Sequence, residues 1–220
     1  MAVFRAAPVM LTRHKISYVP VPKNACTSLK TMFFEIENGF PFQPFKASGR
    51  HYWIHDLYPS VPFGKLRHKA IADHHRIAVL RDPVKRLLSC YANRVVHHRE
   101  LSQEKAGAQL TEAGLPVDPD LETFVAHLGA YRQAVGSIDH HAAPMVTYLG
   151  DDPGWYARLY RIEETEALAA DLRAMTGTDA ALERLQRGGP KIAVDALSAV
   201  ALKTLKQVYA PDYDVFGAYL

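Results

Sequence analysis

Two short segments of the chain combine cations and hydroxyl groups with the predicted start of a helix. They are 19–30, which reads VPVPKNACTSLK, and 77–91, which reads IAVLRDPVKRLLSCY. The start of a helix binds phosphate or sulfate because its first N–H groups lack intrahelical partners and its dipole is positive there. Two such starts in one chain predict a ligand with two separate phosphate-type groups.

The first segment supplies its own charge and its own hydroxyl donors. Lys23 adds a mobile cation, and Thr27 and Ser28 add hydroxyl groups beside the backbone. The glycines of the nucleotide-binding pattern G-x-x-x-x-G-K-[ST] are absent, and Pro20 and Pro22 stiffen the approach instead. The segment is therefore P-loop-like, but it lacks the residues that are diagnostic of an ATP or GTP site.

The second segment places an arginine between a strand and a helix. Asp82 is a good N-cap and Pro83 suits the first helical position, so we expect the helix to start directly after Arg81. Ser89 lies about two helical turns beyond Asp82 and thus on the same face. We expect Arg81 and Ser89 to converge on one phosphate, with Arg86 and Lys85 nearby.

The elements around these segments alternate between strands and helices. Compact apolar runs predict buried strands at Ile16–Val21, Ile77–Leu80 and Arg158–Ile162. A helix should start at Cys26 and end at Asn38-Gly39. This order predicts an α/β protein: a P-loop-like three-layer fold with a mainly parallel central sheet and a largely helical C-terminal half.

The remaining segments give weaker expectations. Residues 46–69 should form a strand and irregular loops, and His55, within 53–57 (WIHDL), follows an apolar strand-like run. Apolar stripes predict helices over 121–128, over 168–175 with a stop at Gly177, and over 194–208 with a stop at Pro211.

The composition is that of an ordinary globular protein. The 220 residues are 48% hydrophobic and 22% charged, with a formal net charge of +3, which suits an acidic substrate but is too weak to indicate nucleic acid. There is no signal-peptide core, and no stretch approaches the ~18 apolar residues of a membrane span. We expect a single domain, 1–220, in the reducing cytoplasm, where Cys26 and Cys90 stay unpaired.

Together, the two segments resemble the phosphosulfate and 3′-phosphate motifs of sulfotransferases, most closely the carbohydrate sulfotransferase branch (family 2 type). The loop 22–30 is similar to the first motif, and 81–91 matches the family pattern R-D-P-x-x-R-x-x-S-x-Y. A weaker likeness extends, in the family's order, over 139–144 (DHHAAP), 160–163 (YRIE) and 209–217 (YAPDYDVFG).

The resemblance implies a donor and a reaction. The donor substrate would be 3′-phosphoadenosine 5′-phosphosulfate, and its sulfuryl group would pass in line to a hydroxyl of a glycan or another small molecule, without a metal. Lys23 would stabilise the departing oxygen, while Arg81 and Ser89 would hold the 3′-phosphate. The residues that would wrap the 5′-phosphosulfate are Lys23, Asn24, Ala25, Cys26, Thr27 and Ser28.

The same reaction needs a base, and members of this family commonly use a histidine or glutamate between or near the two motifs. The histidines that qualify by position are His51, His55, His68, His74 and His75. We rank His55 first, because it follows an apolar run and has Asp56 beside it, and His51 second. His74 and His75 precede the second strand, at the wrong end. Glu35 and Glu37, on the first helix, stay open.

Two other functions fit parts of the same pattern. One is a P-loop kinase or other phosphotransferase, although it lacks its glycines and would leave Arg81 and Ser89 without a task. The other is a non-catalytic module that binds a nucleotide or a glycan. The loop 184–191 either forms a plain turn or adds donor contacts through Arg187 or Lys191.

Overall fold

The computed structural model describes residues 8–183 and 188–220. The chain divides into two compact units. Unit 1 comprises Met1–Leu80, Val146–Gln186 and Ala218–Leu220, and unit 2 comprises Arg81–Met145 and Arg187–Gly217. The first predicted anion-binding segment thus lies in unit 1, whereas Arg81 and Ser89 belong to unit 2.

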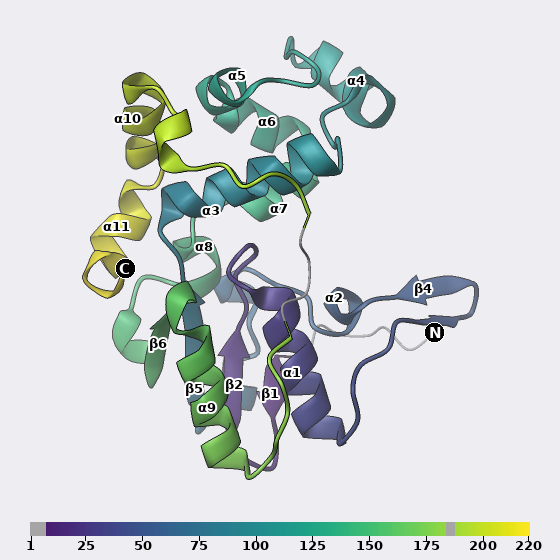
Figure 1. The fold of residues 1–220 in the computed structure, drawn as a ribbon, viewed down its shortest axis with the longest axis vertical. Coiled ribbons are helices and arrows are strands. Elements are labelled where there is room, and N and C mark those ends of the chain that lie inside the picture. The colour runs from purple at the N-terminus through teal and green to yellow at the C-terminus, as the bar shows by residue number, and fades with distance from the viewer. Residues whose placement is uncertain (1–7, 184–187) are drawn as a thin grey trace. The chain divides into compact units, whose positions relative to one another are not determined.

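A four-stranded sheet with the order β1-β2-β5-β6 forms the centre of unit 1 (Figure 1). The strands are β1 (Val9–Leu11), β2 (Ile16–Val19), β5 (His75–Leu80) and β6 (Arg158–Arg161). β5 pairs in parallel with β2 and with β6, and β1 pairs antiparallel to β2. The predicted mainly parallel sheet is confirmed. β1 was missed because three residues carry too little periodicity to be recognised.

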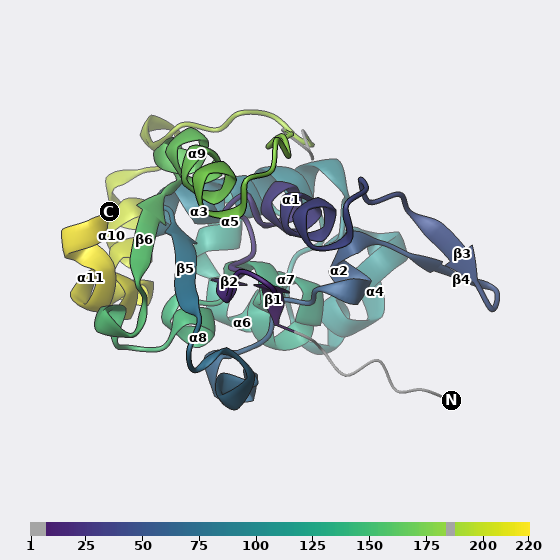
Figure 2. The same cartoon turned by 90° about the horizontal axis from the view of Figure 1, so that it is seen from below.

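Helices cover both faces of this sheet. α1 (Cys26–Asn38) and α9 (Thr165–Thr176) lie side by side on one face, and α8 (Val146–Leu149) lies on the other (Figures 1 and 2). Apolar side chains of α1 and α9 join those of the strands in one core, for example Leu29, Phe33, Ile77 and Leu168. Gly39 ends α1 in the left-handed conformation, at φ 78°, as the Asn-Gly pair predicted.

Residues 45–57 contain two strands where one was expected, and also a short helix. They form a two-stranded hairpin, β3 (Phe45–Ala47) and β4 (Arg50–Tyr52), followed by the helix α2 (Ile54–Leu57). Asp56 caps this helix by accepting a hydrogen bond from the Trp53 N–H at 2.8 Å. His55 therefore follows the strand β4, as expected, and lies on a helix that was not predicted.

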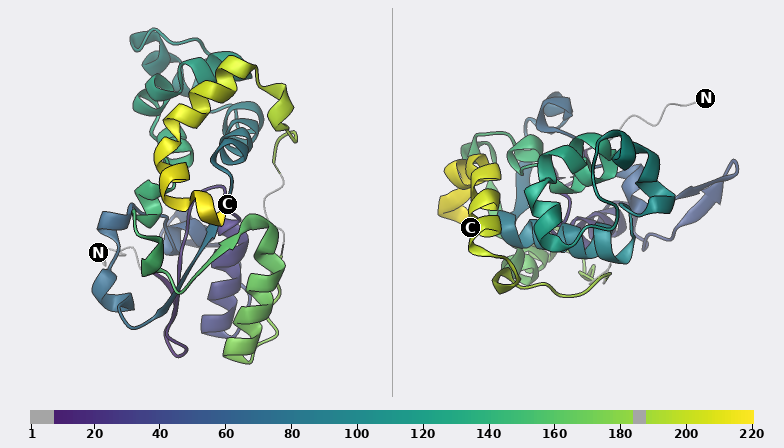
Figure 3. Two further views of the ribbon diagram at one scale, coloured as in Figure 1. Left: turned by 90° about the vertical axis from the view of Figure 1, so that its left-hand side faces the viewer. Right: turned by 90° about the horizontal axis from the view of Figure 1, so that it is seen from above.

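In unit 2, every secondary-structure element among the described residues is a helix (Figure 3). Asp82 caps α3 by accepting from the Lys85 N–H at 2.9 Å, and Pro83 opens the helix, as predicted. The expected helix over 121–128 divides into two at His127. The helix expected over 194–208 begins only at Ala199 but ends at Val208, as predicted. Pro211 lies in the first turn of a new helix, where its missing N–H costs nothing. The helices are α3 (Pro83–Cys90), the π-helical Tyr91–His97, α4 (Gln103–Glu112), α5 (Leu121–Ala126), α6 (Leu128–Ala134), α7 (Gly136–Ala142), α10 (Ala199–Val208) and α11 (Ala210–Phe216).

Short 3₁₀ turns complete the description: Phe63–Lys65, His68–Ile71, Pro153–Trp155, Ile162–Glu164, Val194–Ala196 and Gly217–Tyr219. Within the described ranges, no helix has both the length and the apolar character that crossing a membrane requires.

Candidate functional site

The loop between β2 and α1 holds its shape without glycine. Lys23 and Ala25 adopt positive φ angles, 71° and 55°, in the left-handed region that costs a side-chain-bearing residue about 1 kcal/mol or more. The buried Asn24 lies between them, and its side-chain amide donates to the carbonyl oxygen of Val79 in β5 at 2.8 Å. A hydrogen bond to the neighbouring strand thus helps to hold a conformation that a P-loop obtains from glycine.

The first turn of α1 opens directly from this loop. Ala25 occupies the N-cap position without a side-chain cap, so the first helical amides depend on other acceptors. Cys26 and Thr27 are half-buried and Ser28 is buried. A 13-residue helix that begins in this way can receive an anion at its N-terminus.

A chain of hydrogen bonds joins α1 to α2 through His55. Its Nε2 lies 2.9 Å from Thr27 Oγ1, and its Nδ1 lies 3.1 Å from Lys30 Nζ. Lys30 Nζ also donates to Ser60 Oγ at 3.0 Å. The structure therefore brings the first-ranked histidine into contact with the hydroxyl of a predicted anion-binding residue.

Lys30 is the member of this chain that sequence reasoning missed. The residue is completely buried, and burial lowers the pKa of its ammonium group. Among the described residues, no carboxylate forms an ion pair with Lys30. Its place beside Leu29 and three residues before Phe33, on the apolar side of the helix, was the signal that could have revealed its burial.

The other candidate bases have different surroundings. His51 is exposed on β4. His68 Nε2 lies 2.8 Å from the carbonyl oxygen of Phe63, and the ring packs edge-on against Phe63 and Trp155, which indicates a structural role. His74 and His75 lie at the N-terminal end of β5, as expected. Glu37 accepts a hydrogen bond from the Thr12 N–H at 2.9 Å, and Glu35 is half-buried.

In unit 2, Arg81 and Ser89 are half-buried at the two ends of α3. Arg86 was expected near the same phosphate, but it serves the interior of the unit. The residue is 1% exposed, and its guanidinium donates to the carbonyl oxygens of His141 (3.2 Å) and Ala143 and lies 5.7 Å from the centre of the Tyr209 ring. That expectation for Arg86 was therefore wrong.

The two segments of unit 2 with a weaker likeness to sulfotransferases, 139–144 and 209–217, lie around Arg86. Tyr209 donates to the Ala142 carbonyl oxygen at 2.7 Å, and Asp212 accepts from the Met145 N–H at 2.8 Å. Tyr213 donates to Asp82, the cap of α3, at 3.1 Å, and burial together with this carboxylate raises the pKa of Tyr213. The C-terminal segment thus fixes both the start of α3 and the turn after α7.

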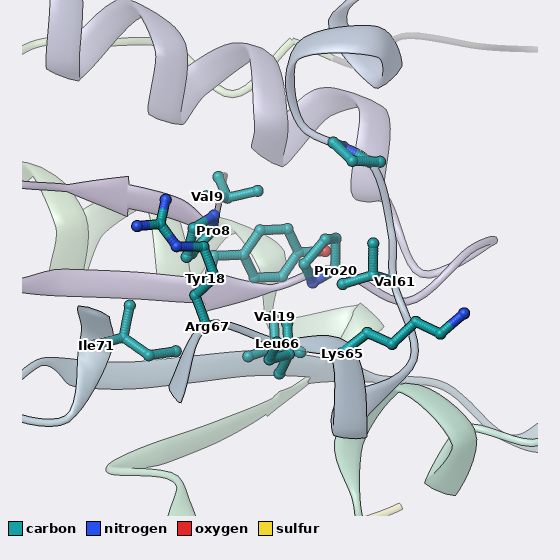
Figure 4. A pocket seen from close by; sticks show the side chains of 11 residues that line it. Pro8, Val9, Tyr18, Val19, Pro20, Val61, Lys65, Leu66, Arg67 and Ile71 are labelled. Carbon is teal, nitrogen blue, oxygen red and sulfur yellow. The ribbon is translucent and has the colours of Figure 1, made fainter. Parts of the chain in front are cut away.

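A small cavity in unit 1 lies beside the β1 edge of the sheet (Figure 4). Its volume is about 10 Å³, roughly enough for one water molecule. The buried ring of Tyr18 lies beside Pro20 and Val61, and burial raises the pKa of its hydroxyl. The cavity is too small to accommodate a substrate.

Two further sequence hypotheses concern the loop 184–191 and metals. Arg187 lies outside the described residues, and Lys191 is exposed. In the part of the chain that the structure describes, no three His, Cys, Asp or Glu side chains are grouped so that they could hold a metal ion.

Comparison with known proteins gives one match. A family model described as "Sulfotransferase family" matches residues 8–219 of the chain. Neither the curated proteins nor the solved structures contain a match.

Proposed function

The chain belongs to the sulfotransferase family, and on that premise we propose that it uses 3′-phosphoadenosine 5′-phosphosulfate as its donor. The acceptor would be a hydroxyl of a carbohydrate or of another small molecule. The observation that carries this proposal is the glycine-free loop 20–25, which contains Lys23 and leads directly into the N-terminus of α1. An anionic sulfuryl donor matches the positive charge of Lys23 and the positive end of the helix dipole.

Each predicted donor contact follows from the chemistry of its residue. Asn24, Ala25, Cys26, Thr27 and Ser28 would wrap the 5′-phosphosulfate through backbone amides and hydroxyls. Lys23 would neutralise the charge that develops on the bridging oxygen as the sulfur leaves it. Arg81 would bind the 3′-phosphate through two parallel hydrogen bonds, and Ser89 would add a hydroxyl.

For the base that activates the acceptor hydroxyl we propose His55, with His51 as the second candidate. The contact between His55 Nε2 and Thr27 Oγ1 at 2.9 Å supports this order, because it puts the ring beside a residue that would bind the phosphosulfate, where the base has to act. His51, on the exposed hairpin, would need the acceptor to extend to β4.

We also propose that residues 1–220 act as one catalytic domain in the cytoplasm. The family match over residues 8–219 includes segments of both compact units, which supports a single functional entity. Cys26 and Cys90 are both free, which is compatible with a reducing compartment.

Calorimetric binding tests the donor. We expect 3′,5′-adenosine bisphosphate to bind at least about tenfold more tightly than 5′-adenosine monophosphate, which lacks only the 3′-phosphate. Arg81→Ala should abolish this difference, whereas Lys203→Ala, which changes an exposed lysine of α10, should keep it. Tight binding of ATP with weak binding of the bisphosphate would instead support a kinase.

Transfer of labelled sulfate to a panel of glycans and small hydroxyl compounds tests the reaction. Lys23→Ala should chiefly lower kcat, and Arg81→Ala should chiefly raise the KM for the donor. Tight bisphosphate binding without transfer to any acceptor would indicate a non-catalytic binding module.

A further inference from the structure

The hydrogen-bond chain of Thr27, His55, Lys30 and Ser60 has an unusual polarity. A functional histidine is commonly oriented by a carboxylate or a carbonyl oxygen, which accepts the proton of one ring nitrogen. Here the neighbour of His55 Nδ1 is the amino group of Lys30, at 3.1 Å. A protonated lysine can only donate, so the usual arrangement is reversed.

This polarity determines which nitrogen of His55 carries the proton. Because the Lys30 ammonium donates to Nδ1, the neutral ring must hold its proton on Nε2. Nε2 then donates to Thr27 Oγ1, 2.9 Å away. In this form the ring presents a hydrogen-bond donor, and not a basic lone pair, to the first turn of α1.

We propose that Lys30 is a positioning residue that locks His55 in the Nε2-protonated tautomer and releases it as a base only when Lys30 gives up a proton. The catalytic meaning of this lock rests on the sulfotransferase function proposed above. Once Lys30 is a neutral amine, the ring proton can move from Nε2 to Nδ1, where Lys30 Nζ accepts a hydrogen bond from Nδ1–H. The lone pair of His55 then lies on Nε2. Nε2 takes the proton of the acceptor hydroxyl while the new O–S bond forms and the bond from sulfur to the bridging phosphate oxygen breaks.

The surroundings of Lys30 and His55 favour loss of the proton from Lys30. Burial lowers the pKa of Lys30, while Cys26, one turn earlier on α1, opposes that shift. On α2, the carboxylate of Asp56 adjoins His55 and is paired with Arg50 at 2.6 Å. The remaining hydrogen-bond partner of Lys30 Nζ is the uncharged hydroxyl of Ser60. Rising pH thus converts a donor histidine into a base.

Nitrogen-15 NMR of histidine-labelled protein tests the lock directly. In the wild type near pH 7, we expect the His55 resonances to show a proton on Nε2 and a bare Nδ1. In Lys30→Met the neighbouring charge is gone, so the imidazolium should persist to a pH at least about one unit higher than in the wild type. Lys46→Met, which changes an exposed lysine of β3, should titrate like the wild type.

Two results would overturn the proposal: a proton on Nδ1 in the wild type, or identical His55 titration in the wild type and in Lys30→Met. The wild-type spectrum decides the tautomer even if Lys30→Met does not fold. With an active enzyme, the acid limb of the kcat profile follows loss of the Lys30 proton in the wild type and deprotonation of His55 alone in Lys30→Met. The limb should therefore lie at least about one unit lower in pH in Lys30→Met, whereas purely structural damage would lower kcat equally at every pH. Absence of sulfate transfer would refute the proposed function but leave the NMR result intact.

Discussion

Replacement of Arg86 by methionine tests whether this arginine acts inside unit 2 rather than on a ligand. Methionine keeps most of the apolar stem but removes the donors to the His141 and Ala143 carbonyl oxygens. A hydrogen bond from a charged donor contributes about 1.5–3 kcal/mol, so two give roughly 3–6 kcal/mol. The variant also no longer buries a charge, which offsets part of this loss. We therefore expect the free energy of unfolding to fall by about 3 kcal/mol.

The assay has to report on unit 2. Both tryptophans, Trp53 and Trp155, lie in unit 1, so fluorescence follows that unit, while far-ultraviolet circular dichroism includes the helices of unit 2. With a urea m-value of about 2 kcal/mol per molar, the dichroism midpoint should fall by about 1.5 M. Arg86→Lys keeps the charge but lacks the planar guanidinium group. Its dichroism midpoint should therefore lie between those of the wild type and Arg86→Met.

A matched control uses the arginine that binds carbonyl oxygens in unit 1. Arg76 donates to Trp155 O at 2.8 Å and to Ala72 O at 2.7 Å. Arg76→Met should therefore lower the urea midpoint that is followed by tryptophan fluorescence. The argument for Arg86 fails if Arg86→Met leaves the dichroism midpoint within about 0.5 M of the wild type, or if it weakens bisphosphate binding without lowering stability.

Three further predictions follow from single contacts. Asn24→Ala removes the buried hydrogen bond to Val79, so it should lower stability by about 1–2 kcal/mol in urea unfolding and also weaken bisphosphate binding; unchanged binding would show that Asn24 does not shape the loop. Tyr213→Phe should cost about 1 kcal/mol through the lost bond to Asp82, and no loss at all would contradict its role in fixing α3. The Trp53 N–H, together with Arg50, holds the pKa of Asp56 below its ordinary value, so this carboxylate stabilises the fold fully above about pH 5, and the stabilisation disappears as the pH falls through the folded-state pKa. Thermal unfolding of Asp56→Asn should accordingly show a flatter acid limb, and parallel curves for the two proteins would exclude this contribution.

Elements governed by local rules could be predicted from the sequence. The start of α3 follows from the capping chemistry of Asp82 and Pro83, and the end of α1 follows from the freedom of Gly39 at positive φ. The central strand β5 follows from its uninterrupted apolar run. α2 could not be predicted in this way because four residues carry too little periodicity, and its only local signal is the cap that Asp56 provides.

The details of the candidate site depend on partners that are distant in the sequence. Nothing local predicts positive φ at Lys23 and Ala25, because the residue between them is held by Val79. The burial of Lys30 becomes clear only when His55 and the loop after α2 lie beside it. The motif thus located the loop, while long-range contacts define its chemistry.

The interleaving of the two units has a consequence for synthesis of the chain. Unit 1 stops at Leu80 and resumes at Val146, so the partner of one side of β5 emerges from the ribosome only after most of unit 2. Until β6 arrives, the apolar β5 has an unpaired edge, which is a template for aggregation. A fragment that ends at Leu80 or at Met145 would keep that open edge permanently. Neither unit can therefore be isolated by simple truncation, and the nascent chain needs its last third before the sheet is complete.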